Sequence, residues 1–209
     1  MERLNDTRDL AWAADRLIEA EPRFGLIVAA HGLPTLRPSP PGLESLLRIV
    51  TDQLISLRAG EAIWRRLASG LGGFTPEAVL ACPEDHLRGL GLSAAKARCF
   101  QAAARAFAEG HFDAPDELSE TEIFRRLTAI RGVGPWTANL YLLTALKAAD
   151  AWPAQDLALQ EAARHLLGMP VRPTPREMER MACAWQPYRS AAALLLWSHY
   201  RGLKGLRQA

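Results

Sequence analysis

The chain has 209 residues, 49% of them apolar, which is enough to bury one sizeable core or two small lobes. It holds no run of about 18 apolar residues, and its N-terminus lacks the basic-then-apolar order of a secretory signal, so we expect a soluble, cytoplasmic protein. A formal net charge of +2 is compatible with a nucleic-acid partner but does not by itself indicate one.

Helical periodicity runs through almost the whole chain. Apolar residues recur three and four positions apart over residues 10–18, over 43–57 and on through 62–67, as the buried stripe of an amphipathic helix does. Residues 93–110 and 192–200 repeat the pattern. No stretch of β-branched residues alternates with period two, so an all-α fold of about ten helices is predicted. Glycine- and proline-rich breaks separate the stripes at 33–42, 70–73, 89–92, 114–116, 131–135, 152–155 and 169–175.

The most informative segment is EIFRRLTAIRGVGPWTANLYLLTAL, residues 122–146. One helix is predicted to end at Ile130 and a second to begin at Pro135, because proline suits the first position of a helix. Between them, Gly132 and Gly134 permit a turn with positive φ, and the N–H groups that follow can hold an anion such as a DNA phosphate. An ordinary corner between two helices is the alternative. The predicted DNA contacts of this hairpin are Arg131, Gly132, Gly134 and Thr137.

The cysteines and histidines predict no metal centre built from side chains. Cys82, Cys99 and Cys183 lie far apart, and their number is odd, so disulfides are not expected in a reducing compartment. An iron–sulfur cluster needs four thiolates, so none is expected either. The histidines are scattered at His31, His86, His111, His165 and His199.

The hairpin pattern LxxIxGVGPWTAxxxLL, followed about twenty residues later by WPxxD, resembles the helix-hairpin-helix DNA glycosylases. Within that superfamily it is similar to the bacterial 3-methyladenine DNA glycosylase II group, without the β-rich N-terminal domain of the larger members. The resemblance implies two helical lobes with a cleft between them. One lobe spans 43–150 and ends in the hairpin, and the other combines 1–42 with 151–209. Five segments of the chain have counterparts in this family: 49–67, 91–107, the hairpin, 152–168 and 185–197.

Asp156 follows Trp152-Pro153 and precedes an amphipathic stretch, so its local sequence predicts a helix N-cap. The resemblance makes Asp156 the catalytic carboxylate, and the two roles are compatible because a cap fixes the side chain. Cleavage of an N-glycosidic bond develops positive charge at the anomeric carbon, which a fixed carboxylate stabilises. An N-alkylated purine already carries positive charge, so its departure requires no second acid.

The base pocket is predicted from the same resemblance. Trp136 and Trp197 match aromatic pocket positions, where an electron-rich ring attracts a cationic base. Leu140 replaces a tyrosine of the group's best-known member, and the neighbouring Tyr141 lies about 100° further round the helix. Trp136 also occupies the position of the lysine with which bifunctional members form a Schiff base, so strand nicking is not expected.

Leu54 in the segment DQLIS matches the family's apolar wedge, which fills the gap left by a flipped base. Gln53 and Ser56 are expected to contact the opposite strand or the backbone. The alternative makes Leu54 a core residue of the 43–57 stripe. The main-chain carbonyls of Thr128, Ile130 and Val133 match positions where such hairpins bind a structural Na⁺ or K⁺.

Together these features predict a monomeric, monofunctional DNA glycosylase that needs no cofactor and acts on damaged double-stranded DNA of the nucleoid. Its predicted reaction is the hydrolytic removal of flipped, alkylated purines such as 3-methyladenine. A glycosylase for deaminated or mismatched bases and a non-catalytic hairpin module for DNA binding are the alternatives. A helical interaction protein with no nucleic-acid role is a third alternative.

Overall fold

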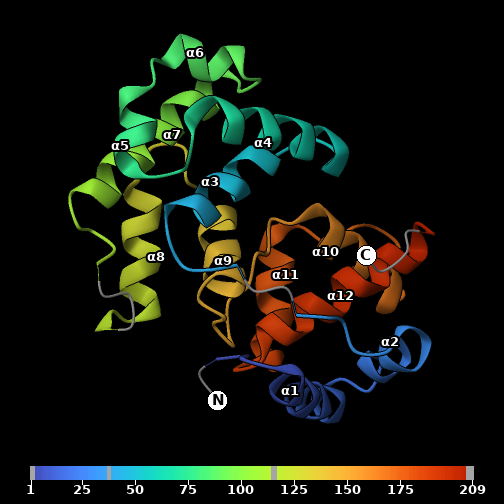
Figure 1. The fold of residues 1–209 in the computed structure, drawn as a ribbon. Coiled ribbons are helices and arrows are strands. Elements are labelled where there is room, and N and C mark those ends of the chain that lie inside the picture. Colours follow the sequence, from blue (N-terminus) through green and yellow to red (C-terminus); the bar gives the residue numbers. More distant parts are fainter. Residues whose placement is uncertain (1–2, 37–38, 114–116, 206–209) are drawn as a thin grey trace. The chain divides into compact units, whose positions relative to one another are not determined.

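The computed structural model describes residues 3–36, 39–113 and 117–205, and within them the chain is all-helical (Figure 1). These residues form no strand, and their only β-pairing is an isolated bridge between Arg3 and Ala148. The all-α prediction is therefore confirmed. The helices are α1 (Thr7–Ala20), α2 (Phe24–His31), α3 (Leu43–Asp52), α4 (Leu57–Leu71), α5 (Pro76–Ala81), α6 (Glu84–Gly89), α7 (Ala94–Ala108), α8 (Glu120–Ala129), α9 (Pro135–Thr144), α10 (Leu157–Leu166), α11 (Pro175–Ala182), the 3-10 helix η2 (Cys183–Trp185) and α12 (Arg189–Leu203).

Local sequence explains where several helices begin. The hydroxyls of Ser93 and Ser119 accept hydrogen bonds from the first-turn N–H groups of α7 and α8. Thr174 and Glu177 form a reciprocal capping box at the start of α11, and Pro175 occupies the first helical position. These caps satisfy donors that a helix start leaves without intrahelical partners.

The first compact unit comprises Met1–Pro38 and Leu142–Ala209. Its central helix is α12, which packs against α1, α2 and α10 through small and apolar side chains such as Ala192 and Leu196. Aromatic rings fill the space beside it, and the Trp185 ring meets Phe24 and Trp152 edge-on at 5.2 and 5.4 Å between centroids.

The second compact unit comprises Ser39–Tyr141. Its central helix is α7, which packs against α3, α5 and α6 and buries Phe100, Ala103 and Ala104. Complete burial of a side chain such as Phe100 stabilises a fold by about 1.5–3 kcal/mol. The surface loops of this unit are therefore attached to a well-packed core.

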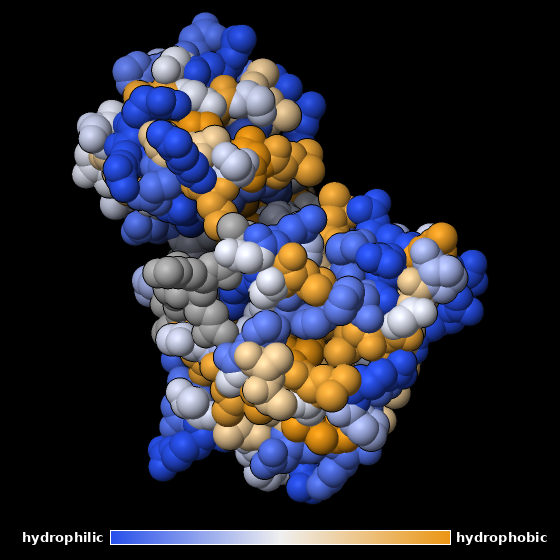
Figure 2. Space-filling view, turned by 90° about the vertical axis from the view of Figure 1, so that its right-hand side faces the viewer, coloured by the Kyte–Doolittle hydropathy of each residue, from blue (hydrophilic) through white to orange (hydrophobic). Residues whose placement is uncertain are grey.

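The apolar stripe over 43–57 is not continuous. Helix α3 ends at Asp52 and α4 begins at Leu57, so residues 53–56 form a turn between the two helices. Leu54 and Leu57, which the periodicity placed on the buried side, are exposed instead. Figure 2 shows how apolar patches interrupt a mostly hydrophilic surface on the face that it draws. Among the described residues, no helix has the length and apolarity to cross a membrane.

Candidate active site

Asp156 is the N-cap of α10, and its carboxylate is held at two points. Its Oδ1 atom accepts a hydrogen bond of 2.9 Å from the Leu159 N–H group. The same oxygen accepts a bond of 3.2 Å from the indole Nε1–H of Trp197 on α12. Asp156 is half-buried, so its charge sits at the surface of the first unit in a fixed orientation.

The segment that leads to Asp156 is tied to α12 as well. The Asp150 carboxylate forms a bidentate ion pair with Arg189, with both contacts at 2.8 Å. The Ser190 hydroxyl accepts a bond from the Ala151 N–H group and donates one to its carbonyl. Arg189 is therefore a structural residue, and α12 anchors the chain both before Asp156 and at Asp156 itself.

A buried amide completes this support. Gln160 lies inside the first turn of α10 and donates a hydrogen bond of 2.9 Å to the Ala154 carbonyl. The Asp156 N–H group in turn donates to the Pro153 carbonyl at 2.9 Å. The WPAQD turn is thus closed by its own backbone and by the helix that follows it. A carboxylate fixed in this way has the geometry to stabilise a nearby positive charge without reorganisation.

In the second unit, α8 and α9 are joined by a tight turn. The Val133 N–H group donates to the Ile130 carbonyl at 3.0 Å, and Gly132 has a φ of +93° at the third turn position, as a type II turn requires. A Cβ on Gly132 would also lie 2.9 Å from the Cβ of Cys99 on α7. Both the conformation and the close approach therefore demand glycine here.

Gly134 serves the second half of the turn. Its carbonyl accepts the N–H of Ala138, which makes Gly134 the residue that precedes the first turn of α9. A Cβ placed on Gly134 would meet no heavy atom within 4 Å, so the space in front of this backbone is open. Arg131, Gly132 and Gly134 are all exposed. This geometry permits close approach of an anion to the start of α9.

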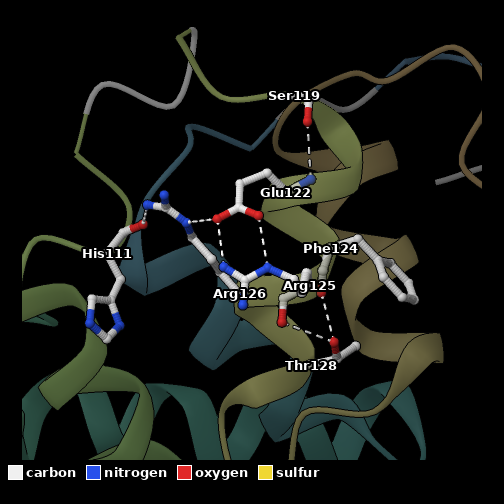
Figure 3. Close-up of polar contacts among 7 residues, drawn as sticks. All are labelled: His111, Ser119, Glu122, Phe124, Arg125, Arg126 and Thr128. Atoms are coloured by element: carbon white, nitrogen blue, oxygen red, sulfur yellow. Dashed lines mark hydrogen bonds and ion pairs between the residues drawn. The ribbon is translucent and has the colours of Figure 1, made fainter.

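An ion cluster stabilises α8, the first helix of the hairpin (Figure 3). The Glu122 carboxylate lies between Arg125 and Arg126, at 2.7 and 2.6 Å from their nearest guanidinium nitrogens. Arg126 also donates to the His111 carbonyl at 2.6 Å. Hydrogen bonds from the two arginines lower the pKa of Glu122 to about 2. The cluster links α8 to the loop that follows α7.

The pocket residues predicted on α9 separate into two groups. Trp136 and Leu140 are half-buried, one helical turn apart. Tyr141 is only 2% exposed, and its hydroxyl accepts the Gly42 N–H at 2.9 Å. Tyr141 was also predicted to line the base pocket, and that role stays a prediction. The residue lies in the core because the helical rotation of about 100° turns it away from Leu140.

The turn over residues 53–56 presents an apolar tip. Leu54 is 99% exposed and has a φ of +56°, a left-handed conformation that is strained for a leucine. Ile55 and Leu57 beside it are also exposed. The alternative that made Leu54 a core residue is therefore wrong. We call residues 53–56 the wedge turn.

The polar residues near Leu54 bond to the protein itself. The Gln53 amide donates a bond of 2.7 Å to the hydroxyl of Thr137 on α9, and Thr137 is buried. The Ser56 hydroxyl caps α4 by accepting the Ala59 N–H at 3.2 Å. Each of these three side chains holds the wedge turn or a helix end, and their DNA contacts stay predictions.

Sequence analysis missed one residue of this region. The Lys96 ammonium on α7 donates to the carbonyls of Thr51 and Gln53, at 2.8 and 2.7 Å. Lys96 lies in residues 91–107, one of the segments that resemble the glycosylase family. Nothing in the order of residues indicates that its partners lie more than forty positions earlier.

Neutral backbone oxygens lie at the predicted alkali-ion position. Thr128 is in the last turn of α8, Ile130 is its C-cap and Val133 follows in the turn. The Ile130 carbonyl already accepts one hydrogen bond, which leaves its second lone pair for a cation. The last carbonyls of a helix lack intrahelical donors and favour positive charge. These residues fit a hard cation, and the ion itself stays a prediction.

The thiols are separate from one another. Cys82 and Cys99 are buried and Cys183 is exposed, and none is in a disulfide. Burial raises the pKa of Cys99 to about 11, so this thiol is protonated at neutral pH. Within residues 3–36, 39–113 and 117–205, no group of three or more histidine, cysteine or acidic side chains is arranged to hold a metal ion.

Comparison with known families and proteins gives a consistent result. A model of the "HhH-GPD superfamily base excision DNA repair protein" family matches residues 47–187, which include the wedge turn, the hairpin and Asp156. DNA-3-methyladenine glycosylase 1 of Schizosaccharomyces pombe is 34% identical over 160 residues, which are 74% of this chain and 70% of that protein. The alkylbase DNA glycosidase-like protein mag2 of the same organism is 27% identical over 90% of this chain and 93% of its own length.

The fold is also similar to solved structures. The 3-methyladenine DNA glycosylase Mag1 of S. pombe, in complex with abasic DNA, superposes with a TM-score of 0.79 at 27% identity. The match covers 94% of this chain and 98% of that one.

Proposed function

Because this chain belongs to the HhH-GPD superfamily of base excision DNA repair proteins, we propose that it is a monofunctional DNA glycosylase for alkylated purines. The observation that carries the proposal is the Asp156 carboxylate, fixed at a helix N-cap by Leu159 and Trp197. Relatives named as 3-methyladenine glycosylases support the substrate class. The substrate is damaged double-stranded DNA, and we propose that the enzyme acts on it as a monomer in the nucleoid.

Asp156 is the catalytic residue in this proposal. As the bond between sugar and base lengthens, positive charge develops at the anomeric carbon, and the negative carboxylate stabilises it. The two hydrogen bonds to Oδ1 keep the carboxylate in one orientation, so little reorganisation is needed during the reaction. Water then forms a bond to the anomeric carbon and releases one proton to the solvent, which completes the hydrolysis. A cationic purine leaves as a neutral base, so the reaction requires neither a second acid nor a cofactor.

Trp136 accounts for the absence of strand nicking in the proposed reaction. Cleavage of the strand by a glycosylase of this kind proceeds through a Schiff base with an amine at the start of the second hairpin helix. The indole of Trp136 occupies that position on α9. The Lys96 amine on α7 is engaged with two backbone carbonyls.

Two tryptophans support the choice of cationic bases. The half-buried rings of Trp136 and Trp197 offer π-faces that attract a positively charged purine more than a neutral one. Leu140 makes the wall of α9 less aromatic than a tyrosine there would, so selectivity depends chiefly on the two indoles. The edge of Trp197 contacts the catalytic carboxylate, which couples base recognition to catalysis in this proposal.

Binding of the damaged duplex is assigned to the second unit. The open backbone at Gly134 and the exposed Arg131 take the phosphate, assisted by an alkali ion at the hairpin carbonyls. The exposed Leu54 enters the base stack when the damaged nucleotide is flipped out. The apolar tip is suited to this because it replaces a stacked base without requiring a polar partner.

The proposal is tested by base release from duplexes that carry single 3-methyladenine, 7-methylguanine, ethenoadenine, uracil or mismatched bases. Release of cationic purines only, with strand breaks only after alkali and no borohydride-trapped adduct, is the expected result. Release of uracil or mismatched bases alone would favour the alternative glycosylase. Duplex binding without release of any base would favour the non-catalytic module.

A further inference from the structure

We infer that Lys96 is a positioning residue that holds the wedge turn in its strained conformation, and so determines how efficiently the enzyme flips a damaged base. This inference rests on the proposed function, because the wedge acts only in a base-flipping enzyme. Lys96 itself touches neither the base nor the reacting sugar in this role. It acts through the backbone that leads into Leu54.

The contacts of Lys96 define the role. Its ammonium donates to the Thr51 carbonyl at 2.8 Å and to the Gln53 carbonyl at 2.7 Å. These two carbonyls belong to the end of α3 and the start of the wedge turn, where helical hydrogen bonding stops. A positive group at a helix C-terminus also interacts favourably with the helix dipole. Lys96 therefore caps α3 and fixes the direction in which the chain leaves it.

The wedge turn needs such an anchor. Leu54 is 99% exposed, so no packing of its side chain holds the left-handed backbone in place. A sparsely populated conformation persists only when the surrounding contacts determine it. The carbonyl contact to Gln53 lies immediately before Leu54, and the Gln53 amide is bonded in turn to Thr137 on α9. The strained residue thus follows one that is held by its backbone and its side chain.

On the other side of the turn, the start of α4 lies close to the end of α3. Gly60, in the first turn of α4, approaches the Asp52 side chain so closely that a Cβ would collide with its carboxylate. Asp52 is held by Arg48 at 2.9 Å and places its negative charge near Lys96. Burial lowers the pKa of Lys96, and the charge of Asp52 opposes that shift. The amine is set in a shaped site rather than on an open surface.

A different role for a lysine in such a protein is a direct contact to DNA phosphate. Two of the three ammonium donors are already used on protein carbonyls, which argues for the positioning role. The two roles make different predictions. Loss of a phosphate contact reduces the salt dependence of DNA affinity by about one counterion, whereas loss of a positioning contact leaves that slope unchanged.

The experiment compares Lys96→Met with wild type and with Lys96→Arg, which keeps the positive charge and the N–H donors. Arg98→Met serves as the matched control, because Arg98 is on the same helix and its ion pair with Glu84 is exposed. We expect Lys96→Met to lower single-turnover base release about 30-fold. Lys96→Arg should recover most of the rate, and Arg98→Met should retain it.

A double-mutant cycle with Leu54→Ala tests whether Lys96 acts through the wedge. If it does, Lys96→Met causes little further loss when Leu54 is already truncated, and the salt slope of duplex binding stays at the wild-type value. The inference would be overturned if the double variant lost activity by the product of the two single losses. It would also be overturned if Lys96→Met reduced the salt slope of duplex binding by about one.

Hydrogen exchange supplies a readout that is independent of activity. The Gln53 backbone amide of the wedge turn, which donates to the Val50 carbonyl, should exchange faster in Lys96→Met than in wild type, while amides in the centre of α7 keep their rates. Unchanged exchange in the wedge turn would overturn the inference even if activity fell. Faster exchange in a protein that releases no base would uphold the structural role of Lys96 and refute the proposed function instead.

Discussion

The bond between the Trp197 indole and Asp156 provides a sharp test of how the carboxylate is positioned. Trp197→Phe keeps an aromatic ring on α12 but removes the N–H donor to Oδ1, together with the pyrrole part of the indole. A hydrogen bond to a charged group contributes about 1.5–3 kcal/mol, and the 3.2 Å length of this half-buried bond favours the lower value. A loss of about 1.5 kcal/mol at the transition state corresponds to a rate about tenfold lower.

The assay is single-turnover release of 3-methyladenine at saturating enzyme, which separates the chemical step from DNA binding and product release. Trp12→Phe is the matched control, because Trp12 is a partly exposed tryptophan of the same unit, on α1. Trp197→Ala, which removes the ring as well, should lose more than Trp197→Phe. A wild-type rate in Trp197→Phe would refute the positioning argument, and so would an equal loss in Trp12→Phe.

Further predictions concern the hairpin, the α8 cluster and the wedge. Gly132→Ala should lower stability by about 1–3 kcal/mol in thermal denaturation, because the φ of Gly132 is +93° and the new Cβ meets Cys99. Gly134→Ala should leave stability unchanged but weaken duplex binding, because the space in front of its backbone is open. The pKa of Glu122 is lowered from 4.5 to about 2 in the folded protein. The stability that its carboxylate contributes is therefore complete above about pH 4.5 and is lost as the pH falls towards 2. The Tm difference between wild type and Glu122→Gln should vanish over that range. Leu54→Ala should reduce base release but shift stability by less than about 0.5 kcal/mol, since the side chain is exposed; a large fall in Tm would contradict the wedge assignment.

Residues that begin or end helices, above all glycine, proline and the N-cap residues, explain why much of the fold was predictable. The glycines and the proline of RGVGP placed the hairpin turn correctly, and α9 begins at Pro135 as predicted. The cap role of Asp156 also followed from local sequence and is confirmed by the bond to Leu159. These features depend on neighbours within a few positions, where the order of residues carries the signal.

The features that hydrophobic periodicity could not predict depend on contacts between residues far apart in the sequence. Leu54 continues the apolar stripe of α3 in sequence, yet the chain turns at Gln53 because Lys96 and Thr137 hold it from other helices. The same limit applies to Trp197, whose bond to Asp156 joins residues 41 positions apart. A hydrophobic pattern indicates which residues suit a core. It does not indicate where residues distant in sequence stabilise a strained turn.

The catalytic assignment of Asp156 is tested most directly by Asp156→Asn. Asparagine is as good an N-cap as aspartate, so the variant should keep its fold, its Tm and its affinity for duplex DNA while losing the negative charge. Asp85→Asn is the control, because Asp85 is 91% exposed on α6. We predict that single-turnover release of 3-methyladenine falls about 100-fold or more in Asp156→Asn and not in Asp85→Asn. A folded, DNA-binding Asp156→Asn protein that releases the base at the wild-type rate would contradict the account.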